Sequence, residues 1–143
     1  MITNQLYIED LYSGQEAKLT KVISDEDIHV FAELSGDHNP VHLDDEYASK
    51  TIFKKRVAHG FLTASLISTV IATKLPGPGS IYLKQSLKFI APVFVGETVE
   101  AKVKVIDINL EKKKVKLLTE CLKSRNIILT GEAEILIDSK KNP

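Results

Sequence analysis

One uncharged segment limits the folds open to this chain more than any other feature. Residues 60–75 are apolar, small or hydroxylated on every side, and the first charge is Lys74. A helix of this kind is expected to be buried all round. A helix of this length rises only about 24 Å, whereas a bilayer span needs about 20 apolar residues. We therefore expect a core helix and no membrane anchor, with an abrupt stop at Pro76-Gly77-Pro78-Gly79.

After this stop the apolar period changes from that of a helix to that of a strand. Four segments alternate, and their expected inward positions are Ile81, Leu83, Leu87 and Phe89; Val99, Ala101, Val103 and Val105; Val115, Leu117, Thr119 and Cys121; and Ile127, Leu129, Ala133, Ile135 and Ile137. Such alternation predicts half-buried strands. The short, turn-rich connections between them favour antiparallel neighbours in a meander.

The N-terminal part of the chain adds a strand and a capped helix. Residues 16–22 alternate weakly and predict a first strand. Ser24 with the acidic residues after it is typical of a helix N-cap, and Gly36 is well placed to end that helix. A short helix is expected from Asp44 to Ser49. These elements predict an α+β fold in one domain, 1–143, in which a curved antiparallel sheet wraps one long central helix. Residues 138–143 are expected to form a flexible tail.

Composition excludes several classes of partner. The 143 residues carry 19 basic and 19 acidic side chains, so no overall field attracts nucleic acid or an anionic membrane. The single cysteine, Cys121, rules out an internal disulfide and is expected to be a small buried hydrophobe. Since no basic segment followed by an apolar one opens the sequence, no export signal is expected, and the cytoplasm is the expected compartment.

The sequence Gly36-Asp37-His38-Asn39-Pro40-Val41-His42 contains the residues best suited to chemistry. Asn39-Pro40 interrupts any regular helix, so we expect a turn that brings Asp37 and His42 together. A carboxylate and an imidazole facing one cavity can move protons on and off a water molecule. The alternative is ordinary turn chemistry, in which Asp and Asn side chains bond their own backbone. All four histidines, including His29 and His59, lie in this half of the chain.

His59-Gly60 stands where the long helix is expected to begin. Backbone N–H groups in the first turn of a helix have no partners within it and favour an anion or a developing negative charge. Gly60 would let a ligand carbonyl approach closely, although a glycine that merely eases entry into the helix is an equal alternative. With the Asp37 and His42 pair, these groups suit addition of water to a conjugated thioester, which builds negative charge on the thioester oxygen.

Three stretches resemble the R-specific enoyl-CoA hydratases of the MaoC-like, hot-dog-fold superfamily. They are residues 32–42, which include the family's Gly-Asp-x-Asn-Pro-x-His pattern, residues 58–62 and residues 79–83. The resemblance implies a helix wrapped by the sheet, dimerisation through the sheets and no metal or redox cofactor. It also implies reversible syn addition of water to a trans-2-enoyl-CoA, giving the (3R)-hydroxyacyl-CoA. The expected substrate is therefore an acyl-CoA thioester.

The resemblance also implies a role for each matched residue. Asp37 and His42 would hold and activate the water, and which of the two takes the proton stays open. The backbone N–H of Gly60 would bind the thioester oxygen. Ser68 matches a serine near the water and would orient it, although a hydroxyl in a helix often bonds the carbonyl one turn back.

Several alternatives stay open in the sequence. A hot-dog thioesterase, a dehydratase acting on acyl-carrier-protein thioesters and a non-catalytic acyl-binding subunit would share the fold. His38 and His59 with a carboxylate could bind zinc, but they lack a recognisable ligand spacing, so no metal is expected. Residues 54–56 are basic and would either face solvent or meet the phosphates of coenzyme A. Acyl chain length is not defined.

Apolar residues at outward positions of the strands indicate a partner chain. These positions are Ile106, Leu118, Leu122, Ile128 and Leu136. One helix covers one face of such a sheet and leaves strand edges open, so a second copy of the chain is expected to cover apolar surface. The sequence predicts a homodimer or a larger assembly of dimers.

Overall fold

The computed structural model of the chain describes residues 5–141. The strands are β1 (Glu16–Val22), β2 (Ile81–Gln85), β3 (Lys88–Phe89), β4 (Thr98–Asn109), β5 (Lys114–Lys123) and β6 (Asn126–Leu136). The helices are the 3-10 helix η1 (Ile8–Asp10) and the α-helices α1 (Asp25–Ser35), α2 (Pro40–Leu43), α3 (Asp45–Ser49) and α4 (Gly60–Thr73). Within the described residues, no helix combines the length and apolar character needed to cross a membrane.

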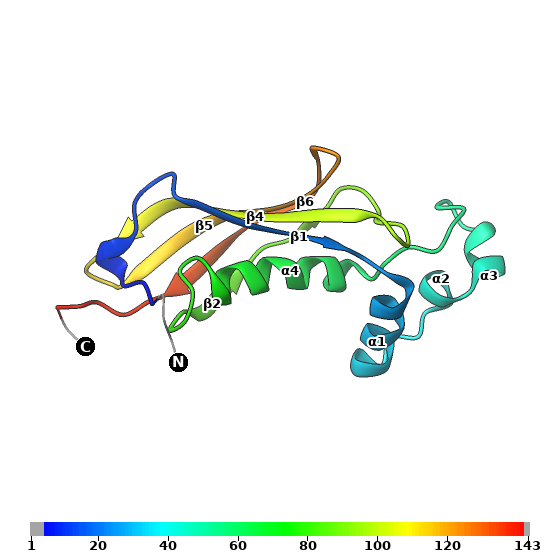
Figure 1. Cartoon of the computed structure of the whole chain (residues 1–143), viewed down its shortest axis with the longest axis horizontal. Helices are drawn as coiled ribbons and strands as arrows, with labels where there is room; N and C mark the ends of the chain where they lie inside the picture. The colour runs from blue at the N-terminus through cyan, green and yellow to red at the C-terminus, as the bar shows by residue number, and fades with distance from the viewer. Residues whose placement is uncertain (1–4, 142–143) are drawn as a thin grey trace.

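All the strands belong to one antiparallel sheet of six, in the order β1-β4-β5-β6-β2, with β3 also paired to β6. The sheet curves over α4, and α1, α2 and α3 gather beyond the end of the sheet where α4 begins (Figure 1). This arrangement confirms the predicted α+β fold with a central helix. The short helices therefore lie next to the N-terminus of α4, where the candidate site residues are located.

Helix α4 is buried on one side only. The side chains that it packs against the sheet are those of Leu62, Thr63, Leu66, Ile67, Val70 and Ile71. Each fully buried aliphatic side chain contributes about 1.5–3 kcal/mol to folding, so this contact anchors the core. Phe61, Ser65 and Ser68 are exposed. The prediction of a helix buried all round is wrong for this side, because apolar and hydroxyl residues suit both a packed face and the wall of a groove.

The segment predicted as one strand over residues 81–89 is divided into β2 and β3, and both pair with β6. The predicted four-strand meander is therefore wrong in its first member, and only β4, β5 and β6 form a meander. Gly131 explains the break between β2 and β3. A Cβ at that position would lie 1.8 Å from the backbone oxygen of Ser86, so only glycine lets the chain cross there. Strand β2 stands at the end of the strand order and is an edge strand.

A β-bulge near the start of β6 reverses which side chains face the core. Cys121 pairs with Leu129, but the next residue of β5, Leu122, pairs with Ile127, so Ile128 is the extra residue. Ile128 is 2% exposed and Ile127 is 41% exposed. The sequence predicts the opposite assignment, and it is wrong because a bulge changes the parity of the strand. The remaining outward positions are exposed or partly exposed as expected: Ile106, Leu118, Leu122 and Leu136.

Both ends of the described chain meet beside η1. The backbone N–H of Ile8 donates to the carbonyl of Asp138 at 2.9 Å, and the N–H of Lys140 donates to the Glu9 carboxylate at 2.8 Å. The first residues of the expected tail over 138–143 are therefore fastened to η1 and not free. Residues 142–143 lie outside the described residues.

Candidate active site

The turn between α1 and α2 carries Asp37. Helix α1 ends at Gly36, whose φ of +81° is the left-handed conformation expected of a glycine in this position. The Asp37 carboxylate accepts a hydrogen bond from the N–H of Asn39 at 3.2 Å, and the Asn39 side chain caps α2. Pro40 is the first residue of that four-residue helix, a position that needs no N–H donor. The expected turn is present, but Pro40 also starts one helical turn, which carries His42.

One hydrogen bond fixes the tautomer of the neutral His42 ring. Its Nδ1 lies 2.7 Å from the backbone oxygen of Val57. A carbonyl oxygen only accepts, so Nδ1 carries the proton and donates it, leaving Nε2 with a free lone pair in the neutral ring. Burial lowers the pKa of His42 below its ordinary value, although the hydrogen bond to Val57 opposes this shift. His42 is therefore a neutral base with one nitrogen available.

Arg56 fixes the backbone beneath that ring. Its Nε donates to the carbonyl of His42 at 2.7 Å, and its guanidinium pairs with Asp25 in the first turn of α1. The Arg56 side chain is only 12% exposed, whereas Lys54 and Lys55 are exposed. Among the three basic residues 54–56, Arg56 therefore faces neither solvent nor a ligand phosphate. It joins α1 to α2.

His59 lies against both Asp37 and His42. It is 2% exposed, and its Nε2 donates to the backbone oxygen of Asp37 at 3.0 Å. Its ring stacks on that of His42, with centroids 3.9 Å apart and planes inclined by 26°. Side-chain ligand atoms of Asp37, His42 and His59 all lie within 4.8 Å of one another. Because one hydrogen bond spans about 2.8 Å, a single water can bond both Asp37 and His42.

This trio fits a metal ion poorly. His59 already uses Nε2 as a donor, and its Nδ1 is enclosed. Nδ1 of His42 is likewise occupied by the carbonyl of Val57, so the two histidines keep few nitrogens available to a metal ion. His38 bonds Glu33 at 2.8 Å and the oxygen of Gly36. The geometry therefore favours proton transfer over metal binding.

Gly60 opens α4 beside these groups. It is the first residue of the helix, so its own N–H and that of Phe61 have no acceptor within the helix. A Cβ on Gly60 would lie 2.8 Å from Cε1 of Phe89, so any larger residue must displace that ring. The pair of free N–H groups at the positive end of α4 suits an oxygen that gains negative charge.

Two cavities share Phe89 in their walls, and Gly60 lines one of them. The first, about 410 Å³ and here called the His42 cavity, is lined by His42, Gly60 and Phe89, among others. The second, about 670 Å³ and here called the α4 groove, lies between α4 and the strands β2 and β3. Its lining is largely apolar and includes Phe31, Phe61, Ala64, Ser68, Leu87 and Phe89. A ligand bound at Gly60 could thus extend in two directions.

The structure brings together three of the four residues singled out in the sequence. Asp37 lines neither cavity but lies within 4.8 Å of His42, and His42 shares a cavity with Gly60. Ser68 is two turns further along α4 in the groove, about 12 Å from Gly60 along the axis. Within the described residues its hydroxyl has no hydrogen-bond partner, whereas that of Ser65 donates to the carbonyl of Leu62.

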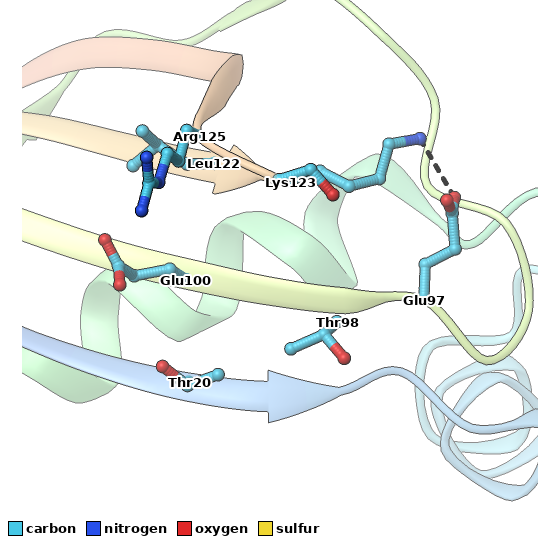
Figure 2. Close-up of a pocket in the computed structure, with 8 residues that line it drawn as sticks. Thr20, Glu97, Thr98, Glu100, Leu122, Lys123 and Arg125 are labelled. Atoms are coloured by element: carbon cyan, nitrogen blue, oxygen red, sulfur yellow. Dashed lines mark hydrogen bonds and ion pairs between the residues drawn. The ribbon is translucent and has the colours of Figure 1, made fainter.

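A separate hollow of about 490 Å³ lies on the face of the sheet away from α4 (Figure 2). Thr20, Glu100 and Arg125 border it, and Lys123 pairs with Glu97 at 2.9 Å across its end. None of the singled-out site residues lines this hollow. Its charged groups form a solvated surface with no base placed beside an oxyanion donor. It offers no competing catalytic site.

His59 and Arg56 are the functional-site residues that the sequence does not identify. The sequence suggests His59 only as a metal ligand, and Arg56 only as a cation that faces solvent or meets the phosphates of coenzyme A. One signal for His59 was present, since a histidine in the otherwise apolar run Val57-Ala58-His59 is a buried polar group that needs partners. Nothing in the sequence indicates that Arg56 is paired with Asp25, which lies 31 residues earlier.

The fold and the site together define a hot-dog-fold protein that places a carboxylate and an imidazole near the N-terminus of its central helix. Sequence comparison agrees, because the family described as MaoC like domain matches residues 10–125. The chain is 48% identical to an (R)-specific enoyl-CoA hydratase of Rhodospirillum rubrum, over 94% of this chain and 93% of that one. It is 44% identical to a 3-hydroxybutyryl-CoA dehydratase of Methylorubrum extorquens, over 95% and 87% of the two chains.

Structural comparison gives the same answer. The solved structure of an (R)-hydratase from Aeromonas caviae superposes with a TM-score of 0.88 at 42% identity, covering 90% of this chain and 98% of that one. The two proteins therefore share their fold and are similar in sequence over almost their whole length. The chain belongs to the MaoC-like domain family.

Proposed function

We propose that this protein is an (R)-specific enoyl-CoA hydratase, which adds water reversibly to a trans-2-enoyl-CoA and forms the (3R)-hydroxyacyl-CoA. The observation that carries this proposal is the pairing of His42, whose Nε2 is left free, with Asp37: ligand atoms of the two side chains lie within 4.8 Å of each other, and His42 shares a cavity with Gly60. Hydration of a conjugated thioester needs a base, a proton donor and an oxyanion site. The similarity to an (R)-specific enoyl-CoA hydratase over almost the whole chain supports the same reaction.

In the proposed mechanism one water lies between Asp37 and His42. The Asp37 carboxylate accepts a hydrogen bond from one of its hydrogens, and Nε2 of His42 takes the other as a proton. The oxygen bonds to C3 of the enoyl chain, and the electron pair of the double bond moves to the thioester oxygen. The proton held by His42 then passes to C2 on the same face. Syn addition follows because one pair of residues serves both steps.

The N–H groups of Gly60 and Phe61 hold the thioester oxygen while charge builds on it. The apolar α4 groove suits the acyl chain, and the His42 cavity suits the pantetheine arm of coenzyme A. Ser68, whose hydroxyl is not used within α4, would orient water or substrate from the groove. These assignments require no resident metal or redox cofactor. We assign the enzyme to the cytoplasm. We expect it to have neither a nucleic-acid nor a membrane partner.

We further propose that the active form is a homodimer or an assembly of dimers. Apolar residues of the edge strand β2 are exposed, with Ile81 at 54% and Leu83 at 42%, and the open side of α4 lies next to this strand. An exposed edge strand with apolar side chains favours pairing with a second chain.

Sedimentation velocity at micromolar concentration is expected to give at least twice the chain mass of 15.9 kDa. Leu83→Lys, which places a charge on this edge, should shift the protein toward the monomer. The matched exchange of an exposed edge cation, Lys84→Gln, should leave the mass unchanged. A wild-type protein that sediments only as a monomer would contradict the dimer.

The pH dependence of hydration is expected to follow His42. Its Nε2 must be unprotonated to act as a base, and burial lowers its pKa below the ordinary 6.5. The midpoint of the acid limb of kcat/KM should therefore lie below pH 6.5. NMR titration should show His42 below 6.5 and His38 above it, since Glu33 raises the pKa of His38. An acid limb above 6.5 would contradict the assignment of His42 as base.

Gly60→Ala is expected to lower kcat/KM by about 10- to 100-fold. The added Cβ would meet Phe89 at 2.8 Å and displace its ring, which lines both cavities. The double variant Gly60→Ala/Phe89→Ala should recover most of the loss, with Phe89→Ala alone as the control. Steady-state kinetics with crotonyl-CoA test this. Failure of the double variant to recover would show that Phe89 is not the cause.

The function itself is tested with crotonyl-CoA as substrate. Absorbance of the enoyl thioester should fall without release of free coenzyme A, and 3-hydroxybutyryl-CoA should be the product. Release of the free thiol would indicate a thioesterase instead. Faster turnover of a crotonyl thioester of acyl-carrier protein would indicate a carrier-protein dehydratase. Binding without turnover would leave only a non-catalytic acyl-binding role.

A further inference from the structure

His59 belongs to the site but touches neither of the spaces that a ligand could fill. It lines neither the His42 cavity nor the α4 groove. Its contacts are a hydrogen bond to the backbone of Asp37, the stack on His42 and a tilted ring contact with Phe31, at 4.8 Å between centroids. A buried polar residue that contacts both proposed catalytic residues and no ligand space acts through them.

We infer that His59 is a positioning residue, which holds Asp37 and His42 at the separation that one water can bridge. This inference rests on the proposed function. Among the residues that the structure describes, the other hydrogen bonds of Asp37 reach Ser35, the exposed last residue of α1, at 3.1 Å and Asn39 in the same turn at 3.2 Å. Within the described residues, the bond from His59 is the one hydrogen bond that ties Asp37 to a distant segment. An exposed turn without such a tie is mobile, and misplacement by 1 Å can cost about 100-fold in rate.

The second ring nitrogen of His59 is enclosed as well. Since Nε2 donates to the Asp37 carbonyl, Nδ1 carries no proton in the neutral ring. Nδ1 is buried and has no partner, so a proton there would be an unpaired buried donor. Neither ring nitrogen of His59 therefore faces a space that a ligand could fill.

Three substitutions separate the two contacts of His59. His59→Gln keeps a donor near the Asp37 carbonyl and removes the ring, His59→Phe keeps a ring and removes the donor, and His59→Ala removes both. With crotonyl-CoA we expect kcat to fall about 10-fold for Gln and Phe and about 100-fold for Ala, with KM within about twofold of wild type. His29→Gln, on an exposed histidine of α1, is the control and should change neither value.

Two NMR measurements test the inference without relying on activity. His59→Gln should raise the pKa of His42, which loses the ring that covers it, whereas His59→Phe should leave it low. Relaxation of the Asp37 amide should show greater motion in the Phe variant than in the Gln variant. Thermal melts confirm that each variant is folded, and the Gln and Phe variants decide the matter if the Ala variant unfolds.

The inference is overturned if both folded variants keep wild-type kcat, or if KM rises while kcat is unchanged. It is also overturned if neither the His42 titration nor the Asp37 relaxation changes. If the wild type does not hydrate crotonyl-CoA, the proposed function fails, but the two NMR measurements still report whether His59 positions Asp37 and His42.

Discussion

Asp37→Asn is expected to lower kcat for hydration of crotonyl-CoA about 1,000-fold and to change KM less than about threefold. The amide still accepts the hydrogen bond from the N–H of Asn39, so the turn keeps its shape. It has no negative charge with which to hold the water or offset the charge on His42. Because Asp37 is exposed, the melting temperature should stay close to that of the wild type.

The matched control for Asp37 is Asp45→Asn. Asp45 is an exposed carboxylate in the first turn of α3 and lies outside both cavities. This exchange removes the same charge eight positions further along the sequence, and kcat should be unchanged. If Asp45→Asn and Asp37→Asn reduced kcat equally, a general loss of negative charge would explain the effect, and the role given to Asp37 would be wrong.

His42→Gln is the second change with a large expected effect, again about 1,000-fold in kcat. Glutamine cannot take a proton from water near neutral pH, although its amide can still form hydrogen bonds in the half-buried site. Because Asp37 and His42 act on the same water, the double variant should be hardly slower than either single variant. Additive losses in the double variant would mean that the two residues act in separate steps.

His38→Gln is the control for His42. His38 is a histidine of the same turn, but its ring bonds Glu33 and the carbonyl of Gly36 and is exposed. Kinetics with crotonyl-CoA should give kcat within about threefold of wild type. A loss as large as that of His42→Gln would mean that the motif requires both histidines, and His42 could not be singled out as the base.

Local chemistry made much of the fold predictable from the sequence. The first strand occupies residues 16–22 as predicted, Ser24 caps α1 through a hydrogen bond from the N–H of Asp27, and Gly36 ends it. Each of these features depends on residues within one helical turn or on a short alternating pattern. The central helix and the stop after it, at Pro76-Gly77-Pro78-Gly79, are predictable for the same reason.

Long-range geometry explains what the sequence could not predict. The inversion of Ile127 and Ile128 depends on a bulge against β5, and the place of β2 depends on its pairing with β6. In the site, the Gly-Asp-x-Asn-Pro-x-His spacing predicts that Asp37 and His42 meet, because both lie in one short segment of the chain. The hydrogen bond from His59 joins residues 22 apart, and no local pattern encodes it.

The stereochemistry of the hydrated product tests the central claim most directly. With Asp37 and His42 acting on one water from one face, hydration of crotonyl-CoA should give only the (3R)-3-hydroxybutyryl thioester. In deuterated water the deuterium at C2 should be syn to the new hydroxyl. Chiral separation of the product after hydrolysis, together with NMR of C2, measures both properties. An S product, or a racemic one, would contradict the mechanism derived from these residues.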